Sequence, residues 1–356
     1  MKTTDSIYQK LPGTLLPWYK KNARILPWRQ DTEPYHVWLS EIMLQQTRVE
    51  AVRTYYLRFL EQLPDIQALA EAPESRLFKL WEGLGYYNRA RNLQKAAHVI
   101  ETQYNGCFPK QYKDIRALPG IGPYTAGAIA SICFNKPYAA VDGNVLRIIT
   151  RITENDAPID CIQTKNEIAE QLEKVYPKDN CGQFTQALME LGATVCTPKS
   201  PKCNKCPANN FCRAYANSTV LQYPVKQPKK DKRLEDRTVF LLQCGERYAL
   251  TKRTESGLLS GLWQLPNVQG KMDVNLALHT ADTLGVQPVE VHKQIHRIHI
   301  FTHIKWQMTC YHISCTKKPS DFTWATAQEI QTVYALPTAF RMFFEFLDET
   351  DKTENK

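Results

Sequence analysis

The chain has 356 residues, of which 43% are hydrophobic and 23% are charged, and its formal net charge is +9 at pH 7. This length exceeds one ordinary core, so we expect two domains, and the composition excludes a disordered chain. The basic excess suits a polyanionic partner, although an ordinary solvated surface could carry the same charge. No apolar run suits a signal peptide or a membrane span, which predicts a cytoplasmic protein of bacterial type whose 11 cysteines are reduced unless they bind metal.

Helices are predicted through the first two-thirds of the chain. Apolar residues recur near a 3.6-residue period over 36–60, with Pro34 and Pro64 as boundaries, which predicts one long helix there. Further helices are predicted at 75–81, 89–104, 112–117, 124–134, 145–151, 164–175 and 183–195. A mainly helical domain is therefore expected for residues 1–220.

The composition then changes at residues 225–237, a polar stretch rich in proline and lysine that is typical of an exposed linker. Beyond it, strands are predicted at 238–243, 248–252, 295–301 and 306–313, with helices at 274–284 and 339–347. The sequence therefore predicts an α+β second domain over 238–350, joined through a linker at 221–237. An ordinary tether explains the basic linker better than a dedicated DNA contact does.

Four cysteines fall within one short stretch with the spacing C-x6-C-x2-C-x5-C, and they are Cys196, Cys203, Cys206 and Cys212. Four thiolates in one loop can surround a zinc ion or a [4Fe–4S] cluster. Structural zinc sites usually combine two close pairs that are far apart in sequence, so one close pair with two wider steps favours the cluster. The iron–sulfur loop is predicted over 196–212, and the other seven cysteines are interpreted as small core residues.

A glycine-containing turn, in the sequence LPGIGPYTAG, joins two predicted helices over residues 112–134. Gly120 and Gly122 permit backbone conformations that other residues resist, and Pro123 suits the first turn of the second helix. Free amides at that helix start, together with the helix dipole, can hold a phosphate. With its flanking helices, this pattern is typical of a DNA-binding helix-hairpin-helix.

Two carboxylates stand in apolar surroundings, Glu41 in WLSEIML and Asp142 in AAVDGNV. Cleavage of a glycosidic bond needs an acid at the leaving group and a negative charge near the cation-like sugar, and such a pair could supply both. We expect burial to raise the pKa of Glu41 and so keep it protonated for the first step. The alternatives are an exposed helix glutamate and an aspartate that only caps the helix predicted at 145–151.

Several motifs together resemble the MutY family of adenine DNA glycosylases, within the helix-hairpin-helix superfamily. They are PWR at 27–29, WLSEIMLQQTRV at 38–49, LWEGLGYYNRARN at 80–92, the hairpin LPGIGPYTAGAI, VDGNVLR at 141–147 and the cysteine loop. The resemblance covers nearly the whole chain. It implies a monomeric DNA-repair enzyme with a [4Fe–4S] cluster, which flips adenine out of a duplex, opposite 8-oxoguanine or guanine, and removes it.

The resemblance also implies roles for individual residues. Glu41 would protonate adenine at N7 and then assist the attacking water, while Asp142 would stabilise the sugar cation. The other residues would be Tyr124 and Asn144 at the sugar and carboxylate site, Trp28 and Arg29 in the adenine pocket, Gln46 and Tyr86 in the base stack, and Leu84 and Gly85 near the lesion. Gln46 also interrupts the apolar period of its helix, as a polar wedge beside a flipped base could, although an exposed glutamine would do the same.

Tyr124 stands where the bifunctional relatives, which are similar to endonuclease III, carry a lysine just after the hairpin glycines. A phenol cannot form the Schiff base through which that lysine leads to strand cleavage. The resemblance therefore implies a monofunctional glycosylase that leaves an intact abasic strand.

Residues 238–347 resemble the MutY C-terminal domain, which has a Nudix-like fold. The stretch 257–285 lacks the R-E-x-x-E-E pattern that holds Mg²⁺ against a pyrophosphate, so pyrophosphate hydrolysis is not expected. Phe301, Thr302 and His303 match the family's F-S-H loop, which touches 8-oxoguanine, and Thr302 keeps the hydroxyl of the usual serine. The alternative is an ordinary strand end with an exposed His303.

Three other functions fit parts of the pattern. A thymine mismatch glycosylase would share the fold, but the full-length C-terminal domain argues against it. A non-catalytic DNA-damage sensor would keep the hairpin and the cluster without needing both carboxylates. A nucleotide pyrophosphatase is not expected because the Nudix acids are missing.

Overall fold

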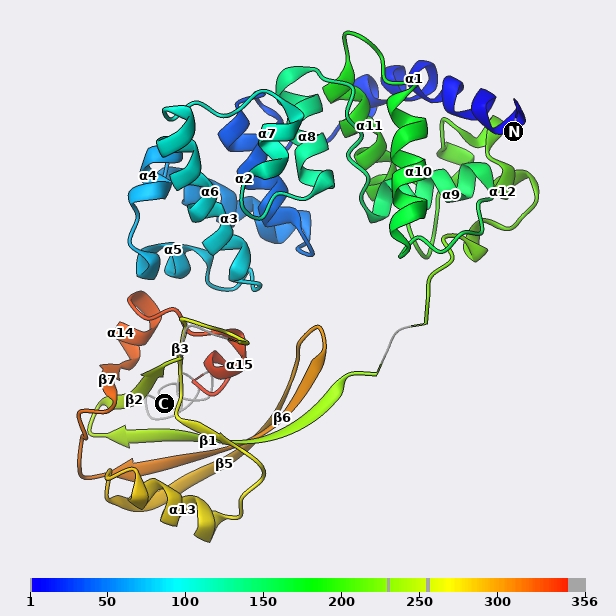
Figure 1. Ribbon diagram of the computed structural model, residues 1–356. Helices are drawn as coiled ribbons and strands as arrows, with labels where there is room; N and C mark the ends of the chain where they lie inside the picture. Colours follow the sequence, from blue (N-terminus) through cyan, green and yellow to red (C-terminus); the bar gives the residue numbers. More distant parts are fainter. Residues whose placement is uncertain (1, 229–230, 254–256, 345–356) are drawn as a thin grey trace, which may run out of the picture. The chain divides into compact units, whose positions relative to one another are not determined.

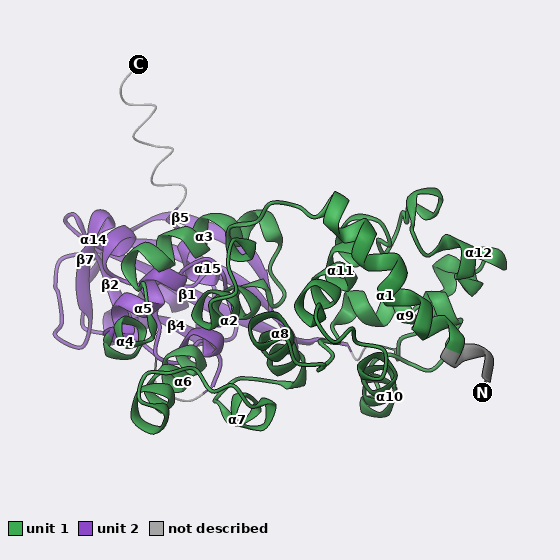
Figure 2. Cartoon of the chain, turned by 90° about the horizontal axis from the view of Figure 1, so that it is seen from above, with its two compact units in different colours: residues 1–71, 91–228 green, residues 72–90, 229–356 purple. Residues whose placement is uncertain are grey.

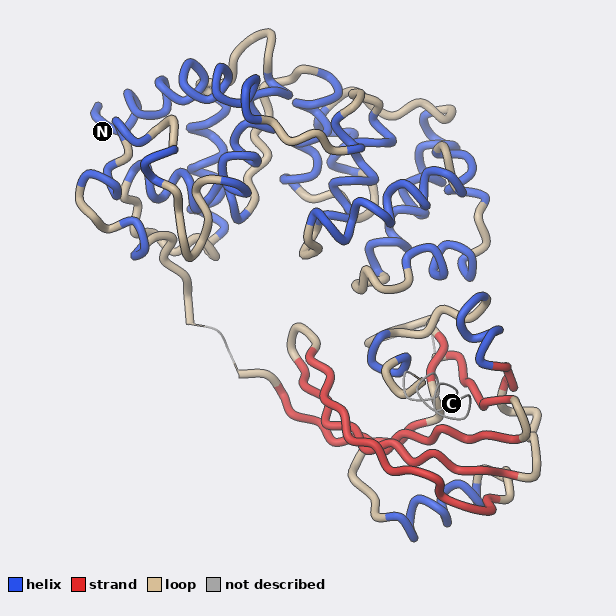
Figure 3. The backbone as a smooth tube through the Cα atoms, turned by 180° about the vertical axis from the view of Figure 1, so that it is seen from behind, coloured by secondary structure: helices blue, strands red, loops and turns tan. Residues whose placement is uncertain are grey.

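The computed structural model describes residues 2–228, 231–253 and 257–344 and divides into two compact units (Figure 1 and Figure 2). The first unit comprises Met1–Glu71 and Arg91–Pro228, and the second comprises Ala72–Ala90 and Lys229–Lys356. Helices make up the first unit, whereas long strands dominate the second (Figure 3). The predicted combination of a helical region and an α+β region is therefore confirmed. Among the described residues, no helix has the length and apolarity needed to cross a membrane.

Most predicted helices recur within a few residues of their expected bounds, and the segments of the helical region follow one another in chain order. They are α1 (Lys2–Asn22), η1 (Pro27–Arg29), α2 (Pro34–Leu44), α3 (Val49–Gln62), α4 (Ile66–Glu71), α5 (Glu74–Trp81), α6 (Asn88–Tyr104), α7 (Tyr112–Ala117), α8 (Pro123–Phe134), α9 (Gly143–Thr153), α10 (Ile162–Glu173), α11 (Cys181–Thr194) and α12 (Arg213–Ala216). The prediction does not include α4, α12 or α1, and α1 contains Pro12 and Pro17. Proline disfavours a helix interior, so packing must stabilise this helix.

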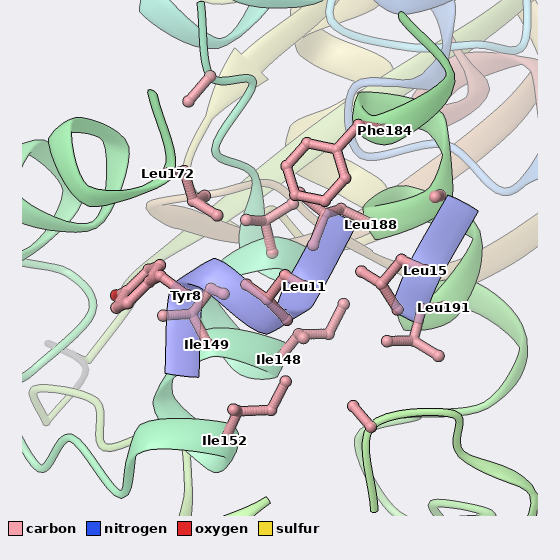
Figure 4. Packing of buried hydrophobic residues seen from close by; sticks show 14 of the residues in the cluster. Tyr8, Leu11, Leu15, Ile148, Ile149, Ile152, Leu172, Phe184, Leu188 and Leu191 are labelled. Carbon is pink, nitrogen blue, oxygen red and sulfur yellow. The ribbon is translucent and has the colours of Figure 1, made fainter. Parts of the chain in front are cut away.

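The side chains that α1 buries account for its stability. Leu11 and Leu15 are fully buried against residues from three other helices (Figure 4). Their neighbours in this core are Ile148, Ile149 and Ile152 of α9, Leu172 of α10, and Phe184, Leu188 and Leu191 of α11. Burial of a large aliphatic side chain contributes about 1.5–3 kcal/mol, so several such contacts outweigh the cost of the two prolines.

The prediction of a single helix over 36–60 is wrong. Helix α2 ends at Leu44 and α3 begins at Val49, and between them Gln46 has a left-handed backbone with φ of 59°. The apolar period continues across the break because both helices bury apolar faces, so periodicity alone does not reveal it.

The second unit is built on one mixed sheet with the strand order β3-β2-β1-β6-β5. Its strands are β1 (Arg233–Cys244), β2 (Arg247–Lys252), β3 (Trp263–Gln264), β4 (Asn267–Gln269), β5 (Pro288–Ile300), β6 (Ile304–Cys315) and β7 (Thr323–Thr326). Strand β6 pairs in parallel with β1 and antiparallel with β5. The remaining helices are α13 (Val274–Thr283), α14 (Ala327–Thr332) and α15 (Thr338–Arg341).

Strand β1 shows why both faces of this sheet are covered. Val239 and Leu241 belong to a core that includes residues of α14 and α15, whereas Phe240 and Leu242 belong to a second core with residues of α13. Successive side chains of a strand point to opposite faces, so one apolar run supplies two cores. Figure 1 shows α13 on one side of the sheet and α14 with α15 on the other.

Several elements of the second unit differ from the expectation. Strand β5 begins at Pro288 and not at 295, and β3, β4, β7 and α14 are not among the predicted elements. Strand β1 begins at Arg233, inside the stretch predicted as linker, because Arg233 already pairs with Ile304 in the ladder with β6. The helix predicted at 339–347 appears as the short α15, and its residues 345–347 lie outside the described residues. The domain limits at 220, 238 and 350 stay a prediction.

Candidate active site

A cavity of about 670 Å³ lies within the first unit, between the turn before α2, helix α2, the α7–α8 hairpin and the starts of α8 and α9. Its volume is in the range of small-molecule sites. It brings together Trp28, Arg29, Glu41, Gln46, Gly120, Gly122, Tyr124, Asp142 and Asn144, all of which were expected to contact the substrate or take part in the reaction.

Glu41 is a buried acid at the wall of this cavity. Its side chain lies on α2 among buried apolar neighbours, and the residue is 5% exposed. Burial raises the pKa of Glu41 to about 7, against the hydrogen bond from Tyr124 and the charge of Arg29. The Tyr124 hydroxyl donates that bond to Glu41 Oε2 over 2.6 Å. The raised pKa keeps part of Glu41 in the acid form near neutral pH, and the burial contradicts an exposed glutamate.

Asp142 caps α9 and also faces the cavity. Its Oδ1 accepts hydrogen bonds from the backbone amides of Asn144 and Val145, at 2.9 and 2.8 Å. Its Oδ2 accepts one from Asn144 Nδ2 at 2.7 Å. Burial raises the pKa of Asp142, while these bonds and the charge of Arg147 oppose the rise. The capping interpretation is thus correct, and the same geometry holds a carboxylate at the cavity wall.

The helix-hairpin-helix has the predicted bounds, with α7 and α8 joined by the turn that contains both glycines. Gly120 has φ of +76°, and a Cβ there would lie 2.6 Å from Asn92 Cβ, so only glycine fits. Gly122 is the N-cap of α8, and a Cβ there would meet open space. Arg116 Nη1 donates to the Ile121 carbonyl over 2.6 Å and so supports the turn. The start of α8 is therefore open to an anion such as phosphate.

The structure adds an ion-pair group that sequence reasoning missed. Glu190 of α11 is fully buried, and its two oxygens bind Arg24 Nε at 2.6 Å and Arg29 Nη1 at 2.9 Å. Burial alone would raise the pKa of Glu190, but the bonds and charges of both arginines hold it below its ordinary value. Glu190 thereby orients Arg29 at the cavity. A signal was present, because Glu190 interrupts the apolar run ALMELGA as Glu41 interrupts WLSEIML.

The four cysteines of the predicted iron–sulfur loop line one small cavity beside α9. Burial raises the pKa of Cys203, Cys206 and Cys212, and the charges of neighbouring cysteines, Cys196 among them, raise it further. These thiols thus lie within electrostatic reach of one another, and Arg151 Nη1 lies 3.4 Å from Cys196 Sγ. In the described part of the chain, no three Cys, His, Asp or Glu side chains are close enough to hold one metal ion.

The remaining predicted residues belong to the second unit and form a separate group. Tyr86 is 50% exposed, has φ of 50°, and its hydroxyl lies 3.3 Å from Thr302 Oγ1. The Phe301 ring packs edge-on against Trp306 with ring centroids 4.8 Å apart. Thr302 and His303 are exposed, and Leu84 is buried beside the partly buried Gly85.

Two parts of the chain match known families. Residues 39–178 match the HhH-GPD superfamily of base excision DNA repair proteins, and residues 238–345 match the NUDIX domain. A thermostable thymine-DNA glycosylase superposes with a TM-score of 0.54 at 29% identity, over 61% of this chain and 98% of that structure. A trapped endonuclease III–DNA covalent intermediate has the same fold, with a TM-score of 0.50 at 24% identity, over 59% of this chain and 98% of that one.

Relatives that are similar over most of this chain agree with these two family matches. The adenine DNA glycosylase of Rattus norvegicus is 32% identical over 94% of this chain and 77% of the rat protein. That of Buchnera aphidicola subsp. Baizongia pistaciae is 38% identical over 76% of each chain. That of Arabidopsis thaliana is 38% identical over 83% of this chain, and the match spans 56% of the plant protein. The chain therefore belongs to the adenine DNA glycosylase family.

Proposed function

We propose that the chain is a monofunctional glycosylase of base excision repair that removes adenine mispaired with 8-oxoguanine or guanine. The observation that carries this proposal is the buried Glu41, whose pKa is about 7, in a cavity that it shares with Asp142. A general acid works best when its pKa lies near the operating pH. A sensor that only binds DNA would not need such a pair.

In the proposed reaction, protonated Glu41 donates its proton to N7 of the flipped adenine. The bond between the sugar C1′ and adenine N9 then breaks, and its electron pair leaves with the base. The ionised Asp142 stabilises the positive charge on the sugar, and the three hydrogen bonds from Asn144 and Val145 hold this carboxylate in place. Water adds to C1′ and gives its proton to the Glu41 carboxylate, which restores the acid.

The phenol of Tyr124 supports a monofunctional enzyme. It donates to Glu41, and it occupies the position where a bifunctional relative would present an amine. The cavity-lining residues that the structure describes include Arg24 and Arg29 but no lysine. Without an amine near the sugar no Schiff base forms, so the strand stays intact after the base is lost.

We further propose that Cys196, Cys203, Cys206 and Cys212 hold a [4Fe–4S] cluster. Four thiols that line one cavity are a suitable donor set, whereas a single zinc ion, the alternative, would need them closer together than the described side chains lie. The bound cluster would tie down the loop, and this would fix Lys199, Lys202 and Lys205 for contact with DNA phosphates. Iron and acid-labile sulfide in the purified protein would support the cluster, whereas stoichiometric zinc would contradict it.

The lesion side is proposed to involve Tyr86 and Thr302, which the second unit holds together. The other contacts proposed there are Leu84, Gly85, Phe301 and His303, and the proposed contacts in the first unit are Trp28, Arg29, Gln46, Gly120 and Gly122. Action as a monomer and a cytoplasmic location stay predictions.

The decisive experiment is single-turnover cleavage of a labelled duplex with one adenine opposite 8-oxoguanine, with and without an alkali step. Glu41→Gln removes the proton donor at nearly constant shape and should lower the rate by at least about a hundredfold. Glu61→Gln, at an exposed position, is the matched control and should retain the wild-type rate.

Strand breaks that need alkali and vanish in Glu41→Gln would support the proposal. Breaks without alkali would contradict the monofunctional mechanism. A wild-type protein that leaves adenine in place but releases thymine from a mispair would contradict the proposed substrate.

A further inference from the structure

Lys79 of α5 and Glu82, which directly follows α5, bind backbone groups within and just after α14 in the second unit. Lys79 Nζ donates to the carbonyl oxygens of Ile330 and Tyr334, at 3.2 and 3.1 Å. The backbone amide of Leu336 donates to Glu82 Oε1 over 2.8 Å. Lys79 and Glu82 also bind each other, with Nζ and Oε2 2.7 Å apart. One ion pair thus makes three contacts with a segment more than 250 positions away in the sequence.

This ion pair differs from an ordinary surface salt bridge. The Lys79 and Glu82 side chains are only 18% and 12% exposed. Removing a charged group from water costs free energy unless hydrogen bonds replace the lost water, and here the backbone groups around α14 provide those bonds. Lys79 also lies at carbonyl oxygens near the C-terminal end of α14, where a cation is favourable. The pair is therefore a specific anchor that joins the end of α5 to the segment around α14 within the second unit.

The anchor leads directly into the turn that carries Tyr86. Trp81 Nε1 donates to the Gly85 carbonyl over 3.0 Å. Arg89 Nη2 donates to the carbonyls of Leu84 and Gly85, at 3.1 and 3.2 Å. Because these bonds tie the turn to the end of α5 and the start of α6, the placement of α5 also places Tyr86. The contact between Tyr86 and Thr302 is a single exposed hydrogen bond of 3.3 Å, which contributes little by itself.

We propose that Lys79 and Glu82 are positioning residues that hold Tyr86 beside Thr302 and thereby set the preference for 8-oxoguanine over guanine opposite the target adenine. The proposal rests on the proposed function, in which Tyr86 and Thr302 contact the lesion. The anchor itself touches neither adenine nor the reacting sugar. Its loss should therefore affect discrimination between the two mispairs more than the chemistry at Glu41.

The first test measures the anchor without DNA. Hydrogen–deuterium exchange of the Leu336 amide is followed in the full-length protein. Glu82→Ala should speed this exchange by about tenfold, because the amide loses its acceptor. Glu82→Gln keeps an acceptor oxygen and should exchange like the wild type. Unchanged exchange in Glu82→Ala would overturn the anchor.

The second test compares single-turnover rates on adenine opposite 8-oxoguanine with those on adenine opposite guanine. Glu82→Ala and Lys79→Met should each lower the ratio of the two rates by about tenfold, since each removes a hydrogen bond to a charged group. Glu82→Gln should restore the ratio, and Lys95→Met, at an exposed position of α6, should leave it unchanged.

An equal loss on both duplexes would overturn the positioning role, because a merely structural defect lowers both rates together. If the wild type cleaves neither duplex, the proposed function fails, and the exchange of the Leu336 amide then decides by itself whether the anchor exists.

Discussion

The hydrogen bond from Tyr124 to Glu41 makes a sharp prediction about the pH dependence of the reaction. Tyr124→Phe removes a donor that lies 2.6 Å from Glu41 Oε2 and keeps the ring. In the wild type, burial raises the pKa of Glu41 to about 7 while this bond opposes the rise. Without the bond, the charged carboxylate loses stabilisation, so the pKa of Glu41 should rise further.

The size of this rise follows from the bond's contribution. A hydrogen bond to a charged group contributes about 1.5–3 kcal/mol, and one pKa unit corresponds to about 1.4 kcal/mol, so the pKa of Glu41 should rise by about one to two units. The proposed reaction starts from protonated Glu41, and its rate therefore falls as the pH rises through this pKa. In Tyr124→Phe the fall should move to a higher pH by the same amount. If Tyr124→Phe also misplaces the Glu41 side chain, the rate should be lower at every pH, but the pH at which the rate falls should not change for that reason.

The assay is the single-turnover rate on adenine opposite 8-oxoguanine, measured from roughly pH 5 to pH 9. Tyr104→Phe, at a partly exposed tyrosine of α6, is the control and should keep the wild-type profile. A fall in rate that stays at the wild-type pH in Tyr124→Phe, or moves to a lower pH, would refute the role assigned to this bond.

Three further predictions concern stability, geometry and the cluster. Because the pKa of Glu41 is raised from 4.5 to about 7, its carboxyl favours the folded state below pH 4.5 and loses that effect as the pH rises through 7. Urea titrations should therefore show that Glu41→Gln stabilises the protein relative to the wild type by up to about 3 kcal/mol more at pH 8 than at pH 4.5. The same difference in the free energy of unfolding at both pH values would contradict this. In Gly192→Ala the new Cβ would lie 2.6 Å from Asn144 Cβ at a buried position, so both the rate of base removal, by about tenfold or more, and the melting temperature should fall, and a wild-type rate would contradict this. Cys206→Ser should lose iron and acid-labile sulfide, and wild-type iron content would exclude Cys206 as a ligand.

Local sequence signals predicted much of the helical fold. Helix α7 has the predicted bounds, and α8 begins one residue before them at Pro123, because proline and glycine restrict the backbone where they stand. Both carboxylates were found because a charge in an apolar run is conspicuous. The raised pKa of Glu41 followed from the same pattern, since a carboxyl that packing buries loses its water.

Other features depend on contacts between distant residues. Helix α1 forms despite its two prolines because α9 and α11 bury its apolar face, and no local pattern records that burial. The break at Gln46 forms part of the cavity wall, although the apolar period continues through it. The boundary of β1 was misplaced for a similar reason, because a partner strand stabilises a charged segment that is typical of a linker in isolation.

The sequence by itself thus determined the fold class, the hairpin, the cysteine spacing and the two carboxylates, because each depends on residues that are neighbours along the chain. Only the tertiary structure decided that Glu190 binds Arg29, that Tyr86 meets Thr302, and that α5 is anchored near α14. The two residues of each pair lie more than 150 positions apart in the sequence. A hydrogen bond forms where packing brings a donor to an acceptor, whatever their separation along the chain.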